Sequence, residues 1–205
     1  MMRTFFLLAA ILACTAAHAV VPDKASPLFA REATDLVAET ALAAREGKRL
    51  AILFEREDCS YCEQMRRKVF TARQAIRDFG ASFRNVALHT DRDGELIAPD
   101  GSHTTPAALA ARLRLTGTPA FAFYDKHGSF ETRHQGAFAD ATGLVALGRY
   151  VSEGAYETLP FATWRPKAAK ASQRARSEVP PMLFIAGDYC TTRPHSTTLV
   201  DQRSQ

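Results

Sequence analysis

Two cysteines in the pattern Cys59-Ser-Tyr-Cys62 constrain this sequence most, because of what lies on either side of them. The apolar run Leu50–Phe54 has the length of a buried strand, and the apolar spacing after Cys62 favours a helix that ends near Gly80. Residues three apart share one face of a helix, so two sulfurs on its first turn can close a disulfide with little backbone movement. The first sulfur would lie at the helix N-terminus, where free N–H groups and the helix dipole favour a nucleophilic thiolate. The second sulfur, set deeper, can then attack a mixed disulfide.

Other uses of a cysteine pair fit this sequence less well. A c-type haem site needs histidine directly after the second cysteine, and that position holds Glu63. A structural zinc site needs four ligands with characteristic spacing. The remaining candidates show no such spacing, and they are Cys190, His89, His103, His127, His134 and His195. We therefore expect no metal and no cofactor, while a purely structural disulfide stays open as an alternative to redox chemistry.

The rest of the pattern predicts an α/β protein. An amphipathic helix over 31–46 precedes the first strand, and the strand Ser82–His89 follows the helix that carries the cysteines. Next we expect a hairpin-like excursion over Asp91–Ser102 and a short helix capped by Thr105. Two strands and an amphipathic helix complete the pattern, at Ala120–Tyr124, Phe130–Gln135 and Phe138–Val151. This order predicts a mixed central sheet with helices on both faces.

The two ends of the chain differ from this central pattern. Arg3, a short apolar run and the small residues that end at Ala19 are typical of a secretory signal peptide over residues 1–19. A buried N-terminal helix and a lipid anchor on Cys14 are the alternatives. We expect the domain to occupy 20–159, and residues 160–205 to form an irregular extension that is partly ordered or flexible. In it Cys190 is a free thiol, a regulatory or second resolving thiol, or a cysteine that pairs between molecules. Export would place the cysteines where disulfides form and persist.

Composition narrows the classes of function. The 205 residues suffice for one domain with a full apolar core, since 46% are hydrophobic and 23% charged. The 26 basic and 22 acidic residues give a net charge of only +4 without a dense basic block, so nucleic-acid binding is not expected. No apolar run reaches the roughly 18 residues of a membrane span, so we expect no stable membrane insertion after signal cleavage.

The chain resembles the thioredoxin superfamily in the strand Leu50–Phe54, the cysteine pair at a helix start and the segment Gly117–Pro119 before a later strand. Within this superfamily, the sequence is most similar to exported SoxW-like thioredoxins. The resemblance implies a thioredoxin-like fold in which Cys59 is the attacking thiolate and Cys62 the resolving thiol. It also implies a cis Thr118–Pro119 bond that faces the pair and leaves nearby backbone free to bind an extended substrate. Apart from the resemblance, Tyr61 either touches substrate or merely packs.

The same resemblance implies a periplasmic reductase of disulfide-bearing protein substrates. A membrane electron donor would keep it reduced, and its role would lie in sulfur-compound oxidation or cytochrome maturation. Two alternatives remain open at this point. One is an oxidant that forms disulfides, and the other is a non-catalytic binding or chaperone-like protein in which the cysteine pair is structural.

The sequence also departs from the family. Thioredoxins carry a buried aspartate six residues before the first cysteine, where this chain has Leu53. Glu55 is a candidate to move the proton of Cys62 instead, or it is a solvated surface acid. The acids Glu55, Glu57 and Asp58 oppose thiolate formation, while the bases Arg56, Arg66 and Arg67 favour it, and sequence alone leaves the balance and the direction of electron flow open.

Overall fold

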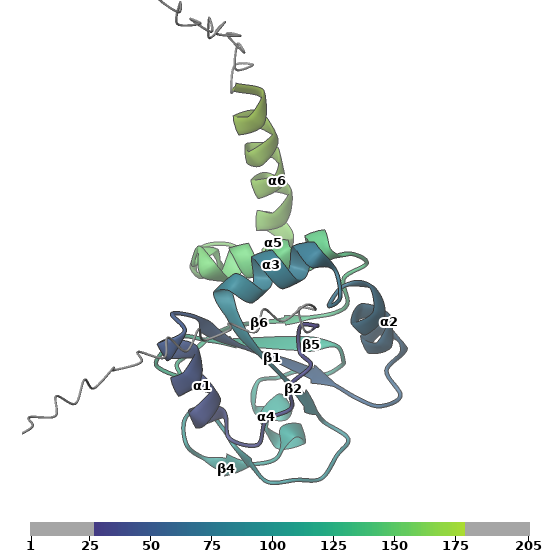
Figure 1. The fold of residues 1–205 in the computed structure, drawn as a ribbon, viewed down its shortest axis with the longest axis vertical. Helices are drawn as coiled ribbons and strands as arrows, with labels where there is room; N and C mark the ends of the chain where they lie inside the picture. Colours follow the sequence, from purple (N-terminus) through teal and green to yellow (C-terminus); the bar gives the residue numbers. More distant parts are fainter. Residues whose placement is uncertain (1–26, 179–205) are drawn as a thin grey trace, which may run out of the picture. The chain divides into compact units, whose positions relative to one another are not determined.

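A four-stranded mixed sheet forms the centre of the protein (Figure 1). The computed structural model describes residues 27–178, which divide into two units on either side of the Arg165–Pro166 bond. The strands lie in the order β2-β1-β5-β6, and they span Phe83–His89, Arg49–Glu55, Ala120–Tyr124 and Phe130–Gln135. β1 pairs in parallel with β2 and antiparallel with β5, which pairs antiparallel with β6. The predicted α/β class and mixed sheet are therefore confirmed.

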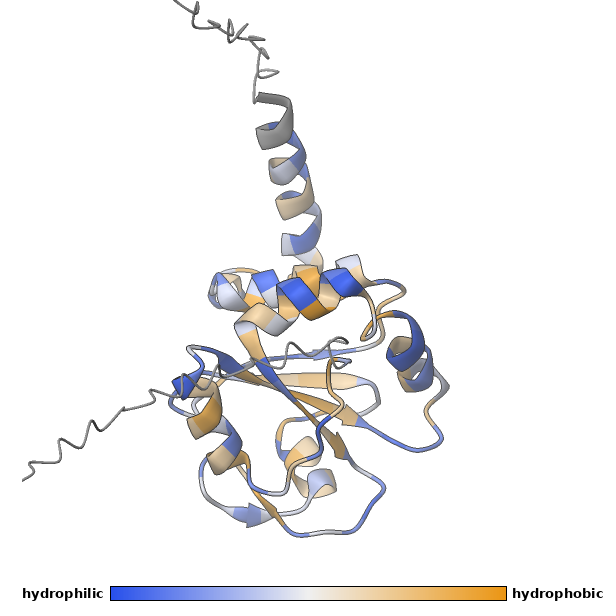
Figure 2. Ribbon diagram, in the orientation of Figure 1, coloured by the Kyte–Doolittle hydropathy of each residue, from blue (hydrophilic) through white to orange (hydrophobic). Residues whose placement is uncertain are grey.

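Helices cover both faces of this sheet, as predicted. The helices α1 (Leu36–Arg45) and α4 (Pro106–Arg112) lie on one face, and α3 (Arg73–Ser82) and α5 (Ala141–Ser152) lie on the other (Figure 1). Alternate residues of β1 point to opposite faces, so each face receives its own apolar cluster. Because both faces are buried, the central strands are continuous apolar runs, which Figure 2 shows as hydrophobic ribbon.

The hairpin-like excursion and the capped short helix that the sequence predicts are both present. Within the excursion, β3 (Leu96–Ile97) pairs antiparallel with β4 (His103–Thr104), and Gly101 adopts a φ of 80° in the turn between them. Thr105 caps α4 by accepting a hydrogen bond from the backbone N–H of Ala108, at 3.2 Å. These expectations are confirmed.

The helix that carries the cysteines is shorter than expected. The single predicted helix is instead two, α2 (Ser60–Lys68) and α3, joined by a turn. Val69 and Phe70 occupy this turn and are fully buried, and the Phe70 ring lies 5.0 Å from that of Phe29. The break thus places two consecutive apolar side chains in the core, which helical periodicity does not anticipate.

The C-terminal extension also differs from the expectation. After a short 3-10 turn, η1 (Ala155–Glu157), the 18-residue helix α6 spans Phe161–Glu178. Its Ala, Lys, Arg and Gln residues favour helix through propensity, although they form no clear apolar stripe and Pro166 interrupts them. The proposed signal peptide, Cys14 and Cys190 lie outside the described residues. Over 27–178, no helix combines the length and apolar character needed to cross a bilayer.

Candidate active site

The two cysteines lie where β1 ends and α2 begins. Cys59 is the N-cap of α2, and its Sγ accepts a hydrogen bond of 3.1 Å from the backbone N–H of Cys62. The two sulfurs form a disulfide with an S–S distance of 2.03 Å and a Cα–Cα distance of 5.2 Å. Cys59 is half-buried, whereas Cys62 is 2% exposed. Cys62 therefore lies deeper than Cys59, as the sequence pattern predicts.

The segment before β5 lies beside Tyr61, one of the two residues between the cysteines. The Thr118–Pro119 peptide bond is cis, as the resemblance implies. Tyr61, Thr118 and Pro119 line one surface hollow of about 370 Å³, together with Gln135 and its neighbours on the chain. Tyr61 is 64% exposed, so its ring is available to a bound partner and does not pack in the core.

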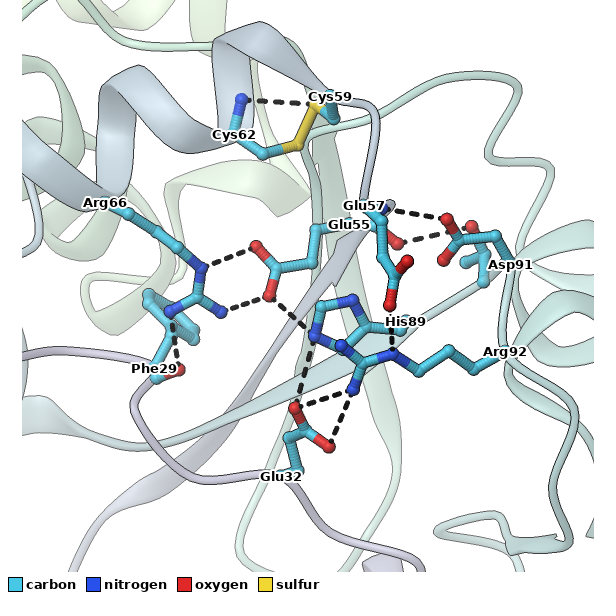
Figure 3. Close-up of polar contacts among 11 residues, drawn as sticks. Phe29, Glu32, Glu55, Glu57, Cys59, Cys62, Arg66, His89, Asp91 and Arg92 are labelled. Atoms are coloured by element: carbon cyan, nitrogen blue, oxygen red, sulfur yellow. Dashed lines mark hydrogen bonds and ion pairs between the residues drawn. A yellow bond between two sulfur atoms is a disulfide. The ribbon is translucent and has the colours of Figure 1, made fainter.

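Glu55 is a buried carboxylate and not a surface acid. It is 2% exposed, and it lies on the same face of β1 as Leu53 because side chains alternate along a strand. Arg66 of α2 binds both carboxylate oxygens, with a distance of 2.9 Å from Nε to Oε2. Figure 3 shows this carboxylate beneath the disulfide, between Arg66 and His89. The protein therefore has a buried acid under the cysteine pair, two residues further along the strand than in the family pattern.

Sequence reasoning missed His89 as a member of the site. His89 ends β2 and is the direct neighbour of Glu55 in the parallel register. Its Nε2 lies 3.3 Å from Oε1 of Glu55 and 3.3 Å from Oε1 of Glu32, while its buried Nδ1 has no hydrogen-bond partner among the described residues. No local signal in the sequence marks His89, because its place beside Glu55 depends on the register of β1 against β2.

Arginines pair with the acids around the cysteines. Arg56 lies 3.3 Å from Asp58, and Arg92 lies 3.0 Å from Glu57. The backbone N–H of Glu57 also donates to Asp91, which lowers the pKa of the Asp91 carboxyl. Since Arg66 binds Glu55, each of the three acids just before Cys59 has a basic partner.

The bases expected to favour the thiolate are thus already paired. Arg66 forms an ion pair with Glu55, and Arg67 forms one with Glu63, one helical turn away. The charges of these side chains largely cancel, so the N–H groups at the start of α2 are the main local feature that favours a Cys59 thiolate. Within residues 27–178, no group of three or more His, Cys, Asp or Glu side chains is placed to hold a metal ion.

The fold and the cysteine pair together define a class of protein. A family model described as a thioredoxin-like domain matches residues 36–152, which is more than half of the chain. The chain therefore belongs to the thioredoxin-like domain family. A cysteine pair at disulfide distance in such a domain suggests, at a general level, a thiol–disulfide oxidoreductase.

Several solved structures are similar to this chain. A putative disulphide-isomerase from Bacteroides thetaiotaomicron is 19% identical, with a TM-score of 0.50 over 62% of this chain and 96% of that chain. A thioredoxin from Thermus thermophilus is 26% identical, with a TM-score of 0.46 over 60% and 87% of the two chains. The oxidised C-terminal domain of DsbD from Neisseria meningitidis is 17% identical, with a TM-score of 0.42 over 57% and 90%. No curated protein matches the chain.

Proposed function

We propose that this protein is an exported thiol–disulfide oxidoreductase that reduces disulfides in protein substrates. The observation that carries the proposal is the unequal placement of the two sulfurs, with Cys59 at the accessible start of α2 and Cys62 buried behind it. A nucleophile that meets a substrate must be reachable, whereas a resolving thiol needs to reach only the first sulfur.

The reaction begins with the reduced form. The Cys59 thiolate attacks one sulfur of a substrate disulfide, forming a mixed disulfide and releasing one substrate thiolate. Cys62 then loses its proton and attacks Sγ of Cys59, which closes the Cys59–Cys62 bond and releases the second substrate thiolate. Two electrons pass from the cysteine pair to the substrate. Glu55 lies beneath the pair and accepts the Cys62 proton, directly or through water.

The substrate lies across the surface formed by Tyr61, Thr118 and Pro119. These residues line a shared hollow beside the start of α2, and none of them is charged. An extended segment next to the substrate disulfide can bind there through backbone hydrogen bonds and apolar contacts. The periplasmic location and the membrane electron donor belong to this proposal as well, since a reductase in an oxidising compartment must be recharged.

The reduction potential of the pair tests the proposal most directly. We would titrate the protein against dithiothreitol or glutathione and measure insulin reduction with the wild type, Cys59→Ser and Cys62→Ser. A potential near the value of about −270 mV found for thioredoxin supports a reductase, whereas a value near −120 mV, roughly that of DsbA, would indicate an oxidant. We expect Cys59→Ser to abolish exchange and Cys62→Ser to trap the mixed disulfide.

The structural alternative gives a different result. If the disulfide only stabilises the fold, no reversible two-electron titration will be found, and Cys59→Ser and Cys62→Ser will lose stability equally without a trapped intermediate. That outcome would remove the catalytic proposal.

A further inference from the structure

We propose that His89 carries the proton of the resolving cysteine from Glu55 to solvent through a hollow that the bound substrate does not cover. This inference rests on the proposed exchange reaction and adds a route and a residue to it. Because His89 acts through Glu55, it is a positioning residue for proton transfer and not a catalytic residue.

A buried proton acceptor under the cysteine pair needs an exit. Both Cys62 and Glu55 are 2% exposed, so neither exchanges protons freely with bulk water. We call the surface around Tyr61 and Pro119 the front of the site. A protein held on Cys59 would cover this surface, so a proton could not leave through it while the mixed disulfide exists. At that stage the Cys62 proton has to leave by another way.

The contacts of Glu55 provide such a way. Arg66 binds the carboxylate from α2 but has no acceptor and keeps its proton, so it cannot carry one onward. His89 contacts the same carboxylate at 3.3 Å, and its ring can both accept and donate a proton. Its Nε2 also lies 3.3 Å from Glu32, whose side chain is 61% exposed. The contacts thus lead from the buried acid, through His89, to the surface (Figure 3).

A separate hollow opens at this end of the route. Glu32, His89 and Arg92 line a surface hollow of about 450 Å³. It shares no lining residue with the hollow around Tyr61 and Pro119. Water in this second hollow can therefore take a proton from His89 while a protein substrate occupies the first.

Charged groups from several elements surround His89. Carboxylates are in the majority, and the nearest bases, Arg66 and Arg92, are each bound to a carboxylate. The titratable and charged groups that face the ring or line its hollow are Glu32, Asp35, Glu39, Glu55, Arg66, Asp91, Arg92, Asp93 and Glu95.

The proton balance of the resolving step is simple. The Cys62 thiol gives its proton to Glu55, and the resulting thiolate displaces the substrate thiolate from Cys59. Glu55 then passes the proton to His89, and His89 passes it to water in the hollow. No electron moves along this path, and no further reactant is required.

The experiment compares substrates that cover the front of the site to different extents. Reduced wild type, His89→Ala and His89→Gln would each be mixed with insulin or with oxidised glutathione between pH 6 and 9. Acid quenching and thiol alkylation then give the rate at which the mixed disulfide is resolved. His103→Ala is the matched control, because His103 also lies 3.5 Å from a glutamate, Glu95, but it is 71% exposed and lies on β4, away from the cysteines.

We expect both His89 variants to resolve the insulin mixed disulfide about tenfold more slowly, which is less than the roughly 10²–10⁴-fold effect of a direct general acid or base because His89 acts through Glu55. With glutathione, which leaves water at the front, the change should stay below about twofold, and His103→Ala should match the wild type. Imidazole, which fits the hollow, should restore the insulin rate of His89→Ala in proportion to its concentration. Urea unfolding identifies any variant that is poorly folded, and His89→Gln keeps a hydrogen bond to Glu55 if His89→Ala is unstable.

Two results would overturn the proposal. One is an unchanged insulin rate and pH profile in a folded His89 variant. The other is equal slowing with both substrates and no rescue by imidazole, which would make His89 purely structural. If the wild type itself neither reduces insulin nor exchanges with glutathione, the proposed function fails, and this case is distinguishable because it does not depend on His89.

Discussion

The pairing of Arg66 with Glu55 should contribute measurably to stability, and Arg66→Met tests it. The substitution removes the guanidinium and keeps an apolar stem, so Glu55 stays buried with only His89 beside it. Breaking a fully buried ion pair costs about 3–5 kcal/mol, and an exposed pair contributes about 0.2–1 kcal/mol. The Arg66 side chain is 37% exposed and that of Glu55 only 2%, so we expect an intermediate loss of about 2 kcal/mol.

A double-mutant cycle separates this charge effect from lost packing. With Glu55→Gln in place, no charge is left unpaired, and Arg66→Met should then cost only about 0.5 kcal/mol. Arg67→Met is the matched control, because Arg67 pairs with Glu63 on the same helix but both side chains are more than half exposed. It should cost less than about 1 kcal/mol.

Urea unfolding of the oxidised proteins at pH 7 measures these differences. For a chain of this size, a loss of about 2 kcal/mol corresponds to a fall in Tm of roughly 4–8 °C. The reasoning is refuted if Arg66→Met is no more destabilising than Arg67→Met, or if its cost is the same with and without the Glu55 charge.

Two further measurements test the packing of the domain and its response to pH. In Gly148→Ala the new Cβ would lie 2.8 Å from Cδ2 of the buried Phe79, so we expect the free energy of unfolding to fall by about 1–3 kcal/mol. Gly94→Ala is the control, because its new Cβ meets no atom within 4 Å and should change stability little. Burial lowers the pKa of His134, whose ring stacks on Phe138 at 4.9 Å, so the folded state binds fewer protons than the unfolded state. The stabilisation is complete above the ordinary histidine pKa of about 6.5 and declines as pH falls below it. Urea unfolding at pH 7.5 and 5 should therefore show a smaller loss of stability for His134→Phe than for the wild type.

The central fold could be predicted because its signals are local. Apolar runs such as Leu50–Phe54 reveal strands that are buried on both faces, and Thr105 marks a helix start by its own capping bond. The break at Phe70 could not be predicted in this way, because tertiary packing against Phe29 decides it. Helix α6 was missed because its residues favour helix by propensity without an apolar stripe.

The candidate site, too, could be predicted only where its signals are local. The spacing of Cys59 and Cys62 and the strand before them are enough to predict a disulfide at a helix start. The pairing of Glu55 with Arg66 and of Glu57 with Arg92 depends on distances between separate elements. His89 needs the register of β1 against β2, which no local pattern contains.

That register also explains why the buried acid is Glu55 and why position 53 is apolar. The strand neighbours of Leu53 are Ala87 on β2 and Phe121 on β5, so a carboxylate there would have no polar partner on either side. An unpaired buried charge is strongly unfavourable. Two residues further along the same face, the β2 neighbour is His89, and Arg66 reaches the same place from α2. The chain therefore keeps an acid beneath its cysteine pair at the end of the strand, where partners from two other elements can satisfy it.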